Sequence, residues 1–369
     1  MNIILRWLLD LLLRFVRSLD AWLLLALLAL MAIGLATQYS ASNESVRMVT
    51  TQGVYFCVGL GALWVGSRVP AHILKQLTPA AYVASLLPLV LVLFIGRGKY
   101  GNHWINLGFF NFQPSELAKL TLPMMLAWRL DRQRLPLRLR GLPVALLIIA
   151  LPVALILLQR DFGTAMLVLA GGVFVLFLAG LSWRWFIAAA GAVAAAAPAA
   201  WFWLLRPYQK DRILTFLNPE NDPMGAGWNI IQSKIAIGGG GLTGKGWGQG
   251  TQSHLDYLPE HTTDFIFSVL SEDFGWIGVV LVLALYLFVV GRCLWIAAES
   301  RDGYARLLVG TLGMSLFVYV LVNGGMISGL LPVVGVPMPL LSYGGTAPVT
   351  LLLGFGVVMA LKGHRQVHR

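Results

Sequence analysis

Charge is what this sequence lacks most. Only 12% of its 369 residues are Asp, Glu, Lys or Arg, whereas a soluble domain carries roughly a quarter. Hydrophobic residues make up 58% of the chain. A chain of this composition cannot cover itself with water-facing side chains, which excludes an ordinary soluble globular domain. We therefore expect most of its surface to face lipid.

Acidic residues and cysteines are also scarce. The chain has 16 Asp and Glu against 27 Lys and Arg, for a formal net charge of +11. No basic run carries a recognisable nucleic-acid-binding module, so we predict no nucleic-acid partner. The 2 cysteines, Cys57 and Cys293, each lie in or beside an apolar run. Their number and placement exclude a disulfide framework and a zinc cluster.

Long apolar runs, in contrast, are abundant. A membrane-spanning helix needs about 20 predominantly apolar residues. The sequence therefore predicts an all-α polytopic membrane protein with about ten transmembrane helices. The expected spans are residues 19–39, 49–65, 79–95, 117–128 with its flanks, 142–158, 163–181, 185–205, 275–292, 307–322 with its flanks, and 345–361.

The distribution of basic residues predicts the orientation. With the N-terminus in the cytoplasm, most of the 27 Lys and Arg fall on the inner side, five of them within residues 129–140. The short outer connections carry only Arg47, Arg97, Lys99 and Arg160. Because cytoplasmic loops are enriched in Lys and Arg, this bias favours an N-in, C-in topology.

The ends of the chain and its long connection complete this outline. Arg6, Asp10, Arg14 and Arg17 recur at helical spacing among leucines, without a cleavage site after them. We expect residues 1–18 to form an interfacial helix rather than a signal peptide. Residues 19–369 read as one transmembrane domain. It includes a long extracytoplasmic loop, residues 206–263, between the seventh and eighth spans.

Two charged side chains fall inside the fourth span. Pro114 suits the first turn of a helix, and Glu116 and Lys119 then share one helix face. They form either a structural ion pair or part of a polar cavity beside a substrate. We favour the cavity, because this span is too short and broken to bury two charges cheaply.

Asp161 lies in the short connection between the fifth and sixth expected spans, two residues after Gln159. Its carboxylate could cap the next helix through the amide of Thr164, or it could face a substrate. The sequence leaves both readings open.

The long loop combines cations with a glycine-rich stretch. Residues 239–250 have glycine at nearly every second position, and such a stretch can offer backbone N–H groups to phosphate. The spacing superficially resembles a nucleotide-binding loop, but Gly246 stands where Ser or Thr would bind magnesium. The stretch also faces outward, so we exclude nucleotide binding. A lipid-borne phosphate and plain loop flexibility both remain open.

Asp264 closes the long loop. From Asp264 to Arg292 is roughly 29 residues, or about 43 Å as a helix, which exceeds the hydrocarbon core of about 30 Å. We therefore expect a separate or re-entrant helix that ends at Gly275. Asp264 would lie at the outer membrane boundary, where apolar neighbours favour proton acceptance. The alternative is that it only caps the helix.

Taken together, these motifs identify a family. The sequence resembles the SEDS family (shape, elongation, division, sporulation), and within it the elongation branch rather than the division branch. Lys234, residues 245–247 and residues 250–253 carry the resemblance to that branch. The most specific matching segments are residues 112–116, 159–164, 222–227, 232–246, 258–267 and 323–345.

The resemblance implies a peptidoglycan glycosyltransferase in the cytoplasmic (inner) membrane of a bacterium. Such an enzyme polymerises lipid II on the outer face, within the elongation machinery, with a class B penicillin-binding protein transpeptidase as partner. It also implies that Asp264 is essential for polymerisation. The central cavity and substrate-binding site would include Gln113, Ser115, Glu116, Lys119, Asp161 and Ser342.

Two positions depart from the family pattern. Thr262 stands where the family commonly has histidine, so a histidine there cannot be required as a base. His103 stands where the family commonly has an arginine before the residue that matches Trp104. An essential arginine–phosphate contact is therefore not expected at that position.

The expected chemistry is transfer with inversion, from an α-linked pyrophosphate donor to a β-1,4 bond. We predict Asp264 as the general base and a set of loop cations that stabilise the departing pyrophosphate. A divalent cation such as Mg²⁺ or Mn²⁺ is compatible with this role, although the sequence names no ligand for it. The alternatives are a lipid II flippase and a scaffold for the transpeptidase. The candidate cations are Arg206, Arg212, Lys234 and Lys245.

Overall fold

The structure is a computed structural model of the whole chain. It describes residues 19–96, 103–106, 108, 111–133, 137, 141–205, 207–221, 226–251 and 260–363. The interfacial helix expected over residues 1–18 lies outside the described residues.

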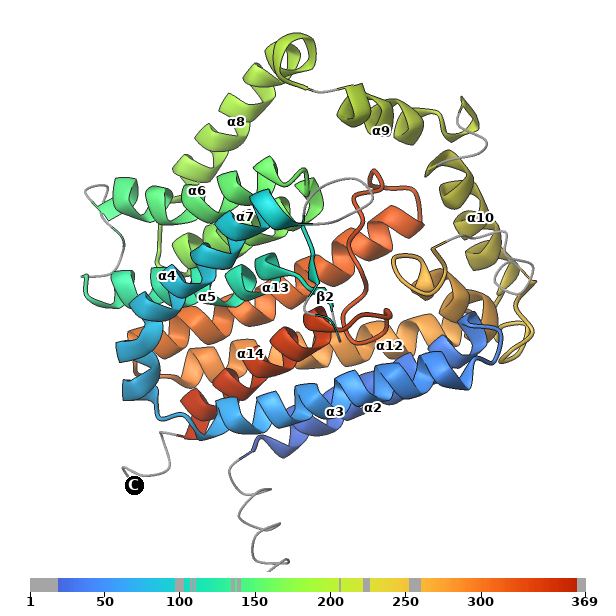
Figure 1. Ribbon diagram of the computed structural model, residues 1–369, viewed down its shortest axis with the longest axis horizontal. Coiled ribbons are helices and arrows are strands. Elements are labelled where there is room, and N and C mark those ends of the chain that lie inside the picture. The colour runs from blue at the N-terminus through green and yellow to red at the C-terminus, as the bar shows by residue number, and fades with distance from the viewer. Residues whose placement is uncertain are drawn as a thin grey trace, which may run out of the picture.

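The described part of the chain is almost entirely helical, as the apolar runs predict (Figure 1). In lipid a helix satisfies all its backbone hydrogen bonds internally, which is why such runs fold locally. Ten helices coincide with the ten expected spans. They are α2 (Ala21–Ala41), α3 (Val46–Arg68), α4 (Ala71–Ile95), α5 (Pro114–Asp131), α6 (Leu142–Leu158), α7 (Phe162–Leu178), α8 (Trp183–Ala199), α12 (Ile266–Glu299), α13 (Gly303–Ile327) and α14 (Thr346–Gly363).

Length and hydropathy support membrane crossing for most of these helices. Within the described residues, six are long and apolar enough to span by themselves, and α6, α7 and α14 are shorter apolar helices. Helix α5 is the exception, because it carries charged residues along its length. These four residues are Glu116, Lys119, Arg129 and Asp131.

Helices α3 and α14, α12 and α13, and α4 and α5 pack as neighbouring pairs. The α3–α14 pair depends on small residues. A Cβ atom placed on Gly356 would lie 2.3 Å from the backbone oxygen of Leu63. Glycine at such positions allows two membrane helices to approach at backbone distance.

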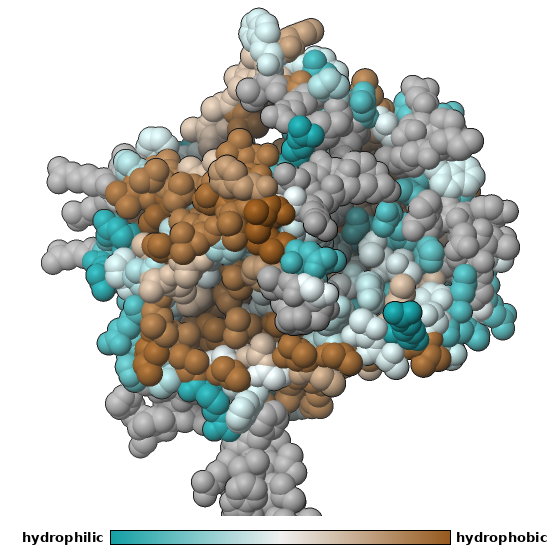
Figure 2. Space-filling view, in the orientation of Figure 1, coloured by the Kyte–Doolittle hydropathy of each residue, from teal (hydrophilic) through white to brown (hydrophobic). Residues whose placement is uncertain are grey.

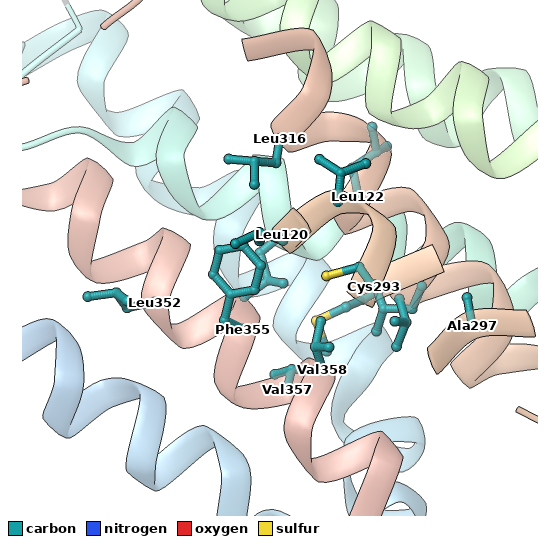
Figure 3. Close-up of a cluster of buried hydrophobic side chains, with 14 of the residues drawn as sticks. Leu120, Leu122, Cys293, Ala297, Leu316, Leu352, Phe355, Val357 and Val358 are labelled. Carbon is teal, nitrogen blue, oxygen red and sulfur yellow. The ribbon is translucent and has the colours of Figure 1, made fainter. Parts of the chain in front are cut away.

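The hydrophobic core lies where α5, α12, α13 and α14 meet. Figure 3 shows Leu122, Cys293, Leu316 and Phe355 of these four helices in one cluster, and all four side chains are buried. Cys293 is a free, buried thiol and Cys57 is free and exposed. Both cysteines therefore serve packing or face lipid, in keeping with the expected absence of a disulfide framework.

The outer surface of the bundle is apolar, as the composition predicts. Figure 2 shows hydrophobic side chains over much of the side formed by α4, α6 and α7. Leu87 is 67% exposed, Phe94 80% and Leu147 67%. Large apolar side chains exposed in this density fit a surface that faces lipid rather than water.

The segment expected as one long loop contains two further helices, α9 (Pro207–Leu217) and α10 (Ala226–Gly239). A π-helical turn (Ala200–Leu204) continues α8, and a 3₁₀ turn (Pro219–Asn221) joins α9 to α10. In Figure 1, α8, α9 and α10 form an arch along one side of the bundle. None of the α8 side chains is buried in the chain, whereas α10 packs on α12.

Helix α12 has a sharp kink, which the sequence analysis predicted from its length. Gly275 adopts φ 61° and ψ −159°, so the backbone is not helical at that residue. The part from Ile266 to Phe274 is therefore a separate short helix. Because Phe265 occupies the N-cap position, Asp264 lies one residue before the cap, and the helix starts slightly later than expected.

Candidate functional site

Glu116 and Lys119 are paired near the start of α5, where this helix meets α13 and α14. Nζ of Lys119 lies 2.5 Å from Oε1 of Glu116, and both side chains are largely buried. Oε2 of Glu116 lies 3.5 Å from the hydroxyl of Thr350, which belongs to α14. Nζ of Lys119 lies 5.0 Å from the ring centroid of Tyr319, which belongs to α13. The pair thus joins α5 to two neighbouring helices.

A short hairpin leads into this pair. Strands β1 (Ile105–Asn106) and β2 (Asn111–Phe112) are antiparallel, with Ile105 opposite Phe112. Gln113 follows as the N-cap of α5, and Pro114 takes the first helical turn, as its missing N–H allows. The hairpin and Pro114 together fix the direction in which the chain enters α5 at Gln113.

Gln113 and Asp161 meet at the N-terminus of α7. Oδ1 of Asp161 accepts a hydrogen bond from the amide of Thr164 at 3.0 Å, so the carboxylate does cap that helix. Oδ2 accepts from Nε2 of Gln113 at 3.2 Å. Capping and a place in the site are therefore compatible for Asp161.

The turn at Val334 and Gly335 lies between the α7 terminus and Asp264. A Cβ placed on Gly163 would lie 2.4 Å from the backbone oxygen of Val334, which shows how closely this turn approaches α7. A Cβ placed on Gly335 would lie 3.5 Å from Oδ2 of Asp264. Gly335 also has φ +73°, a conformation that favours glycine. The start of α7, where Asp161 is the N-cap, and Asp264 thus border the same turn.

Asp264 is half-buried, and the residues on its C-terminal side are apolar. Phe265 and Ile266 are 1% and 0% exposed. The carboxylate therefore lies where the polar end of the bundle meets its dry core. Charge development near such a boundary is screened less than in bulk water, which suits an acid–base group.

Ser342 and Ser115 differ in how their hydroxyls are used. The hydroxyl of Ser342 donates to the backbone oxygen of Thr263 at 2.6 Å and accepts from the amide of Met338 at 2.7 Å. Ser115 is fully buried, and its hydroxyl has no hydrogen-bond partner among the described residues. Ser342 thus holds the backbone beside Asp264, while the hydroxyl of Ser115 is enclosed within the bundle.

Lys245 is engaged in an ion pair that the sequence analysis did not predict. Its Nζ lies 2.6 Å from Oε1 of Glu272, a carboxylate that is fully buried. The amide and hydroxyl of Thr251 donate to the same oxygen, at 2.9 and 3.0 Å. A structural role therefore stands beside the predicted role of Lys245 in pyrophosphate binding.

The glycine-rich stretch packs against the kink of α12. The amides of Lys245 and Gly246 donate to the backbone oxygens of Glu272 and Asp273. A Cβ placed on Gly244 would lie 2.0 Å from that oxygen of Asp273. These glycines allow one backbone to approach another, and the two amides are bonded within the chain rather than directed at a phosphate.

The other predicted cations differ in how far the structure describes them. Lys234 of α10 is exposed, and its Nζ would lie 2.6 Å from a Cβ placed on Gly329, just after the C-terminus of α13. Lysine is favourable at this end of a helix dipole. Arg206 and the side chain of Arg212 lie outside the described residues.

A divalent cation finds no ready site in the part of the chain that the structure describes. No group of three or more His, Cys, Asp or Glu side chains there could hold a metal ion. The turn at Val334 and Gly335 approaches Asp264 and the start of α7, where Asp161 is the N-cap. Mg²⁺ is commonly bound by one or two carboxylates together with substrate phosphates.

The residue that the sequence analysis missed is Asn323. It is fully buried in α13, and its Nδ2 donates to the backbone oxygens of Asp264 at 2.8 Å and Val336 at 2.7 Å. The only signal in the sequence is an amide in an otherwise apolar span, which gives no indication of its partners.

Comparison with known proteins supports one family throughout. The model of the FtsW, RodA and SpoVE family, described as cell cycle protein, matches residues 13–367. Peptidoglycan glycosyltransferase MrdB of Escherichia coli K12 is 46% identical over 350 residues, or 95% of each chain. A probable peptidoglycan glycosyltransferase FtsW of Trichlorobacter lovleyi is 35% identical over 92% of each chain.

Two solved structures share the fold. A chain from a peptidoglycan synthase complex, described as coordinating polymerization and crosslinking, matches with a TM-score of 0.84 and 33% identity. The match covers 95% of this chain and 99% of that one. The rod shape determining protein RodA of Thermus thermophilus matches with a TM-score of 0.72 and 30% identity, over 95% and 98% of the two chains. The chain therefore belongs to the FtsW, RodA and SpoVE family of cell cycle proteins, which is the SEDS family that its sequence resembles.

Proposed function

We propose that this chain polymerises lipid II into β-1,4-linked glycan strands at the outer face of the bacterial cytoplasmic membrane during cell elongation. In coarser terms it is a multi-pass membrane protein and a peptidoglycan glycosyltransferase, the activity by which its curated relatives are named. The observation that carries the proposal is the position of Asp264, half-buried beside the turn that also approaches the N-terminus of α7.

In the proposed reaction Asp264 is the general base. The acceptor hydroxyl oxygen attacks the anomeric carbon of the donor, and its proton passes to the Asp264 carboxylate. A new carbon–oxygen bond forms while the bond to the lipid pyrophosphate breaks on the opposite face, which inverts the anomeric centre. The electron pair of the broken bond leaves with the pyrophosphate.

Other polar groups of the chain would take the remaining tasks. The Glu116–Lys119 pair offers a fixed cation and anion within the bundle, and the free hydroxyl of Ser115 could orient a sugar or peptide group of the substrate. Lys234 is an exposed cation that could stabilise the departing pyrophosphate, and Arg206, Arg212 and Lys245 remain proposed for the same role. A divalent cation, if bound there, would neutralise the same leaving group.

The proposed partner is a class B penicillin-binding protein with transpeptidase activity. The match to a chain of a peptidoglycan synthase complex supports this partner. A polymerase that assembles with a crosslinking enzyme would deliver new glycan strands directly to it.

The test is polymerisation of purified lipid II by the purified chain, with and without the transpeptidase. Asp264→Asn keeps the size and hydrogen-bonding shape of the side chain but cannot accept the proton. We expect a folded variant with polymerisation slowed by about 10²–10⁴-fold, as for the loss of a general base. Glu260→Gln is the matched control, because Glu260 lies four residues before Asp264, in the turn that directly precedes α12, and should be dispensable.

Two results would contradict the proposal. Near-normal polymerisation by folded Asp264→Asn would remove Asp264 from the mechanism. Lipid II transport into vesicles by the purified chain, without polymerisation even when the transpeptidase is present, would favour the flippase alternative.

A further inference from the structure

The backbone around Asp264 is held from two directions. From α13, Nδ2 of Asn323 donates to the backbone oxygen of Asp264 itself at 2.8 Å. The same nitrogen donates to the backbone oxygen of Val336 at 2.7 Å. One buried amide group therefore ties the Asp264 peptide to the segment that begins with the Gly335 turn.

The second set of bonds comes from the segment before α14. The hydroxyl of Ser342 donates to the backbone oxygen of Thr263 at 2.6 Å, and the amide of Tyr343 donates to that of Thr262 at 3.0 Å. Three successive peptide oxygens, from Thr262 to Asp264, are thus each bonded to α13 or to the segment that follows it.

Asparagine is suited to the position in α13 for a chemical reason. Two backbone oxygens facing one side chain need two N–H donors from a single group, and the amide nitrogen of asparagine provides both. Leucine has a similar size but would remove both of these donated hydrogen bonds in a buried place. Aspartate has the same shape but offers at most one donor, when protonated.

We propose that Asn323 is a positioning residue for Asp264, with Ser342 as its second support. The two residues fix the distance between the Asp264 carboxylate and the Gly335 turn, and so the position at which the carboxylate meets the acceptor hydroxyl. This inference rests on the proposed role of Asp264 as general base. Neither residue needs to contact the substrate.

The proposal is tested by kinetics of lipid II polymerisation with Asn323→Leu, Asn323→Asp and Ser342→Ala. Misplacing a catalytic group by about 1 Å can cost about 10²-fold in rate. We expect kcat to fall by roughly that factor for Asn323→Leu, less for Asn323→Asp, and about tenfold for Ser342→Ala. The KM for lipid II should change by less than about threefold, because the hydroxyl of Ser342 is bonded to backbone groups and Asn323 is fully buried.

Thr311→Val is the matched control. Thr311 lies in the same helix and is fully buried, and its hydroxyl has no hydrogen-bond partner among the described residues. This substitution keeps the shape of the side chain and removes only that hydroxyl, about 18 Å along the helix from Asn323. Its kcat and thermal unfolding temperature should match those of the wild type.

The outcomes separate positioning from stability. A fall in kcat with unchanged KM in variants that unfold near the wild-type temperature supports positioning. If the variants unfold early and their kcat recovers fully at a lower assay temperature, the role is structural and the proposal is wrong. Should Asn323→Leu misfold, Ser342→Ala carries the same test with a smaller change.

Failure of the underlying function gives a different pattern. Active Asp264→Asn would overturn the base role and the positioning role together. Inactive Asp264→Asn with fully active Asn323→Leu would overturn positioning alone.

Discussion

At the scale of single residues, the structure shows ion pairs between charged side chains whose roles are open in the sequence alone. Glu116 and Lys119 are the clearest case, because the sequence placed both on one helix face and the structure brings them to 2.5 Å. Tyr319 and Thr350 extend the contacts to α13 and α14. A pair so enclosed can serve the substrate, the packing of the bundle, or both.

Removing one partner should therefore harm the protein more than removing both. Glu116→Gln or Lys119→Met alone leaves an uncompensated buried charge, which typically costs about 3–5 kcal/mol. The double variant leaves none and should unfold at a higher temperature than either single variant. Thermal unfolding in detergent measures the order of stability of the four proteins.

Activity then separates the two roles of this pair. A folded double variant that does not polymerise lipid II would show that the pair binds or orients the substrate. Full activity of the double variant would limit the pair to packing. If the double variant is less stable than both single variants, the two side chains are not energetically coupled and the prediction is wrong.

At the scale of elements, the glycine-rich stretch is attached to α12 by an ion pair and hydrogen bonds. Lys245 and Thr251 both bond to the buried carboxylate of Glu272, directly before the kink at Gly275. The short helix between Asp264 and the kink is therefore held at both ends, by Asn323 at one and by this ion pair at the other.

Lys245→Met should loosen this attachment. It removes the ion pair between Lys245 and Glu272 and should lower the free energy of unfolding by about 1.5–3 kcal/mol, the range for hydrogen bonds to charged groups. Lys245→Arg should retain most of the stability, because it keeps the charge. Lys210→Met is a matched control for losing a cation of the same connection, since Lys210 of α9 lies over the ring of Trp201 instead.

The double variant Lys245→Met with Glu272→Gln distinguishes structure from substrate binding. If Lys245 only holds the stretch in place, the double variant should regain stability and activity together. If Lys245 also binds pyrophosphate, stability should return while the KM for lipid II stays raised.

At the scale of the whole molecule, the two ends of the bundle differ. Asp161, Asp264 and the glycine-rich stretch gather at one end. At the other, Asp20 pairs with Arg292 and Lys362, and Lys75 pairs with Asp131 and Asp302. These two clusters join α2 to α12 and α14, and α4 to α5 and α13. The end expected in the cytoplasm is therefore tied together, which disfavours a flippase that must open to both sides.

Asp20 shows how strongly that end is tied. Burial raises the pKa of this carboxyl, but the hydrogen bonds from Arg292 and Lys362 outweigh burial and hold the pKa below its usual range. A lowered pKa means that the stabilisation is present at pH values above the ordinary Asp range and is lost as the pH falls through the folded-state pKa. The cluster is therefore at full strength at neutral pH.

The expected topology is tested by thiol labelling in intact spheroplasts. A background with Cys57→Ser is needed, because Cys57 is exposed whereas Cys293 is buried. In that background Gln249→Cys should react with an impermeant thiol reagent, and Gln133→Cys should react only after permeabilisation. The reverse pattern would place the Asp264 end in the cytoplasm and overturn the proposed function.

The sequence by itself determined the features that depend on local physics. Ten apolar runs became ten helices, because a backbone in lipid must satisfy its hydrogen bonds within the segment. The kink at Gly275 followed from a run too long for the hydrocarbon core, and Pro114 marked the start of α5. The cap of α7 by Asp161 needed only a carboxylate three residues before an amide.

Only the tertiary structure decided which distant segments meet. Asn323 contacts Asp264 across 59 positions, and Lys245 contacts Glu272 across 27. Such pairs arise from how helices of similar hydropathy pack, and one sequence contains no periodicity that encodes their register. The helices α9 and α10 were missed for a related reason. Their short segments lack a strong apolar run, and α10 is stabilised by packing on α12 rather than by its own pattern.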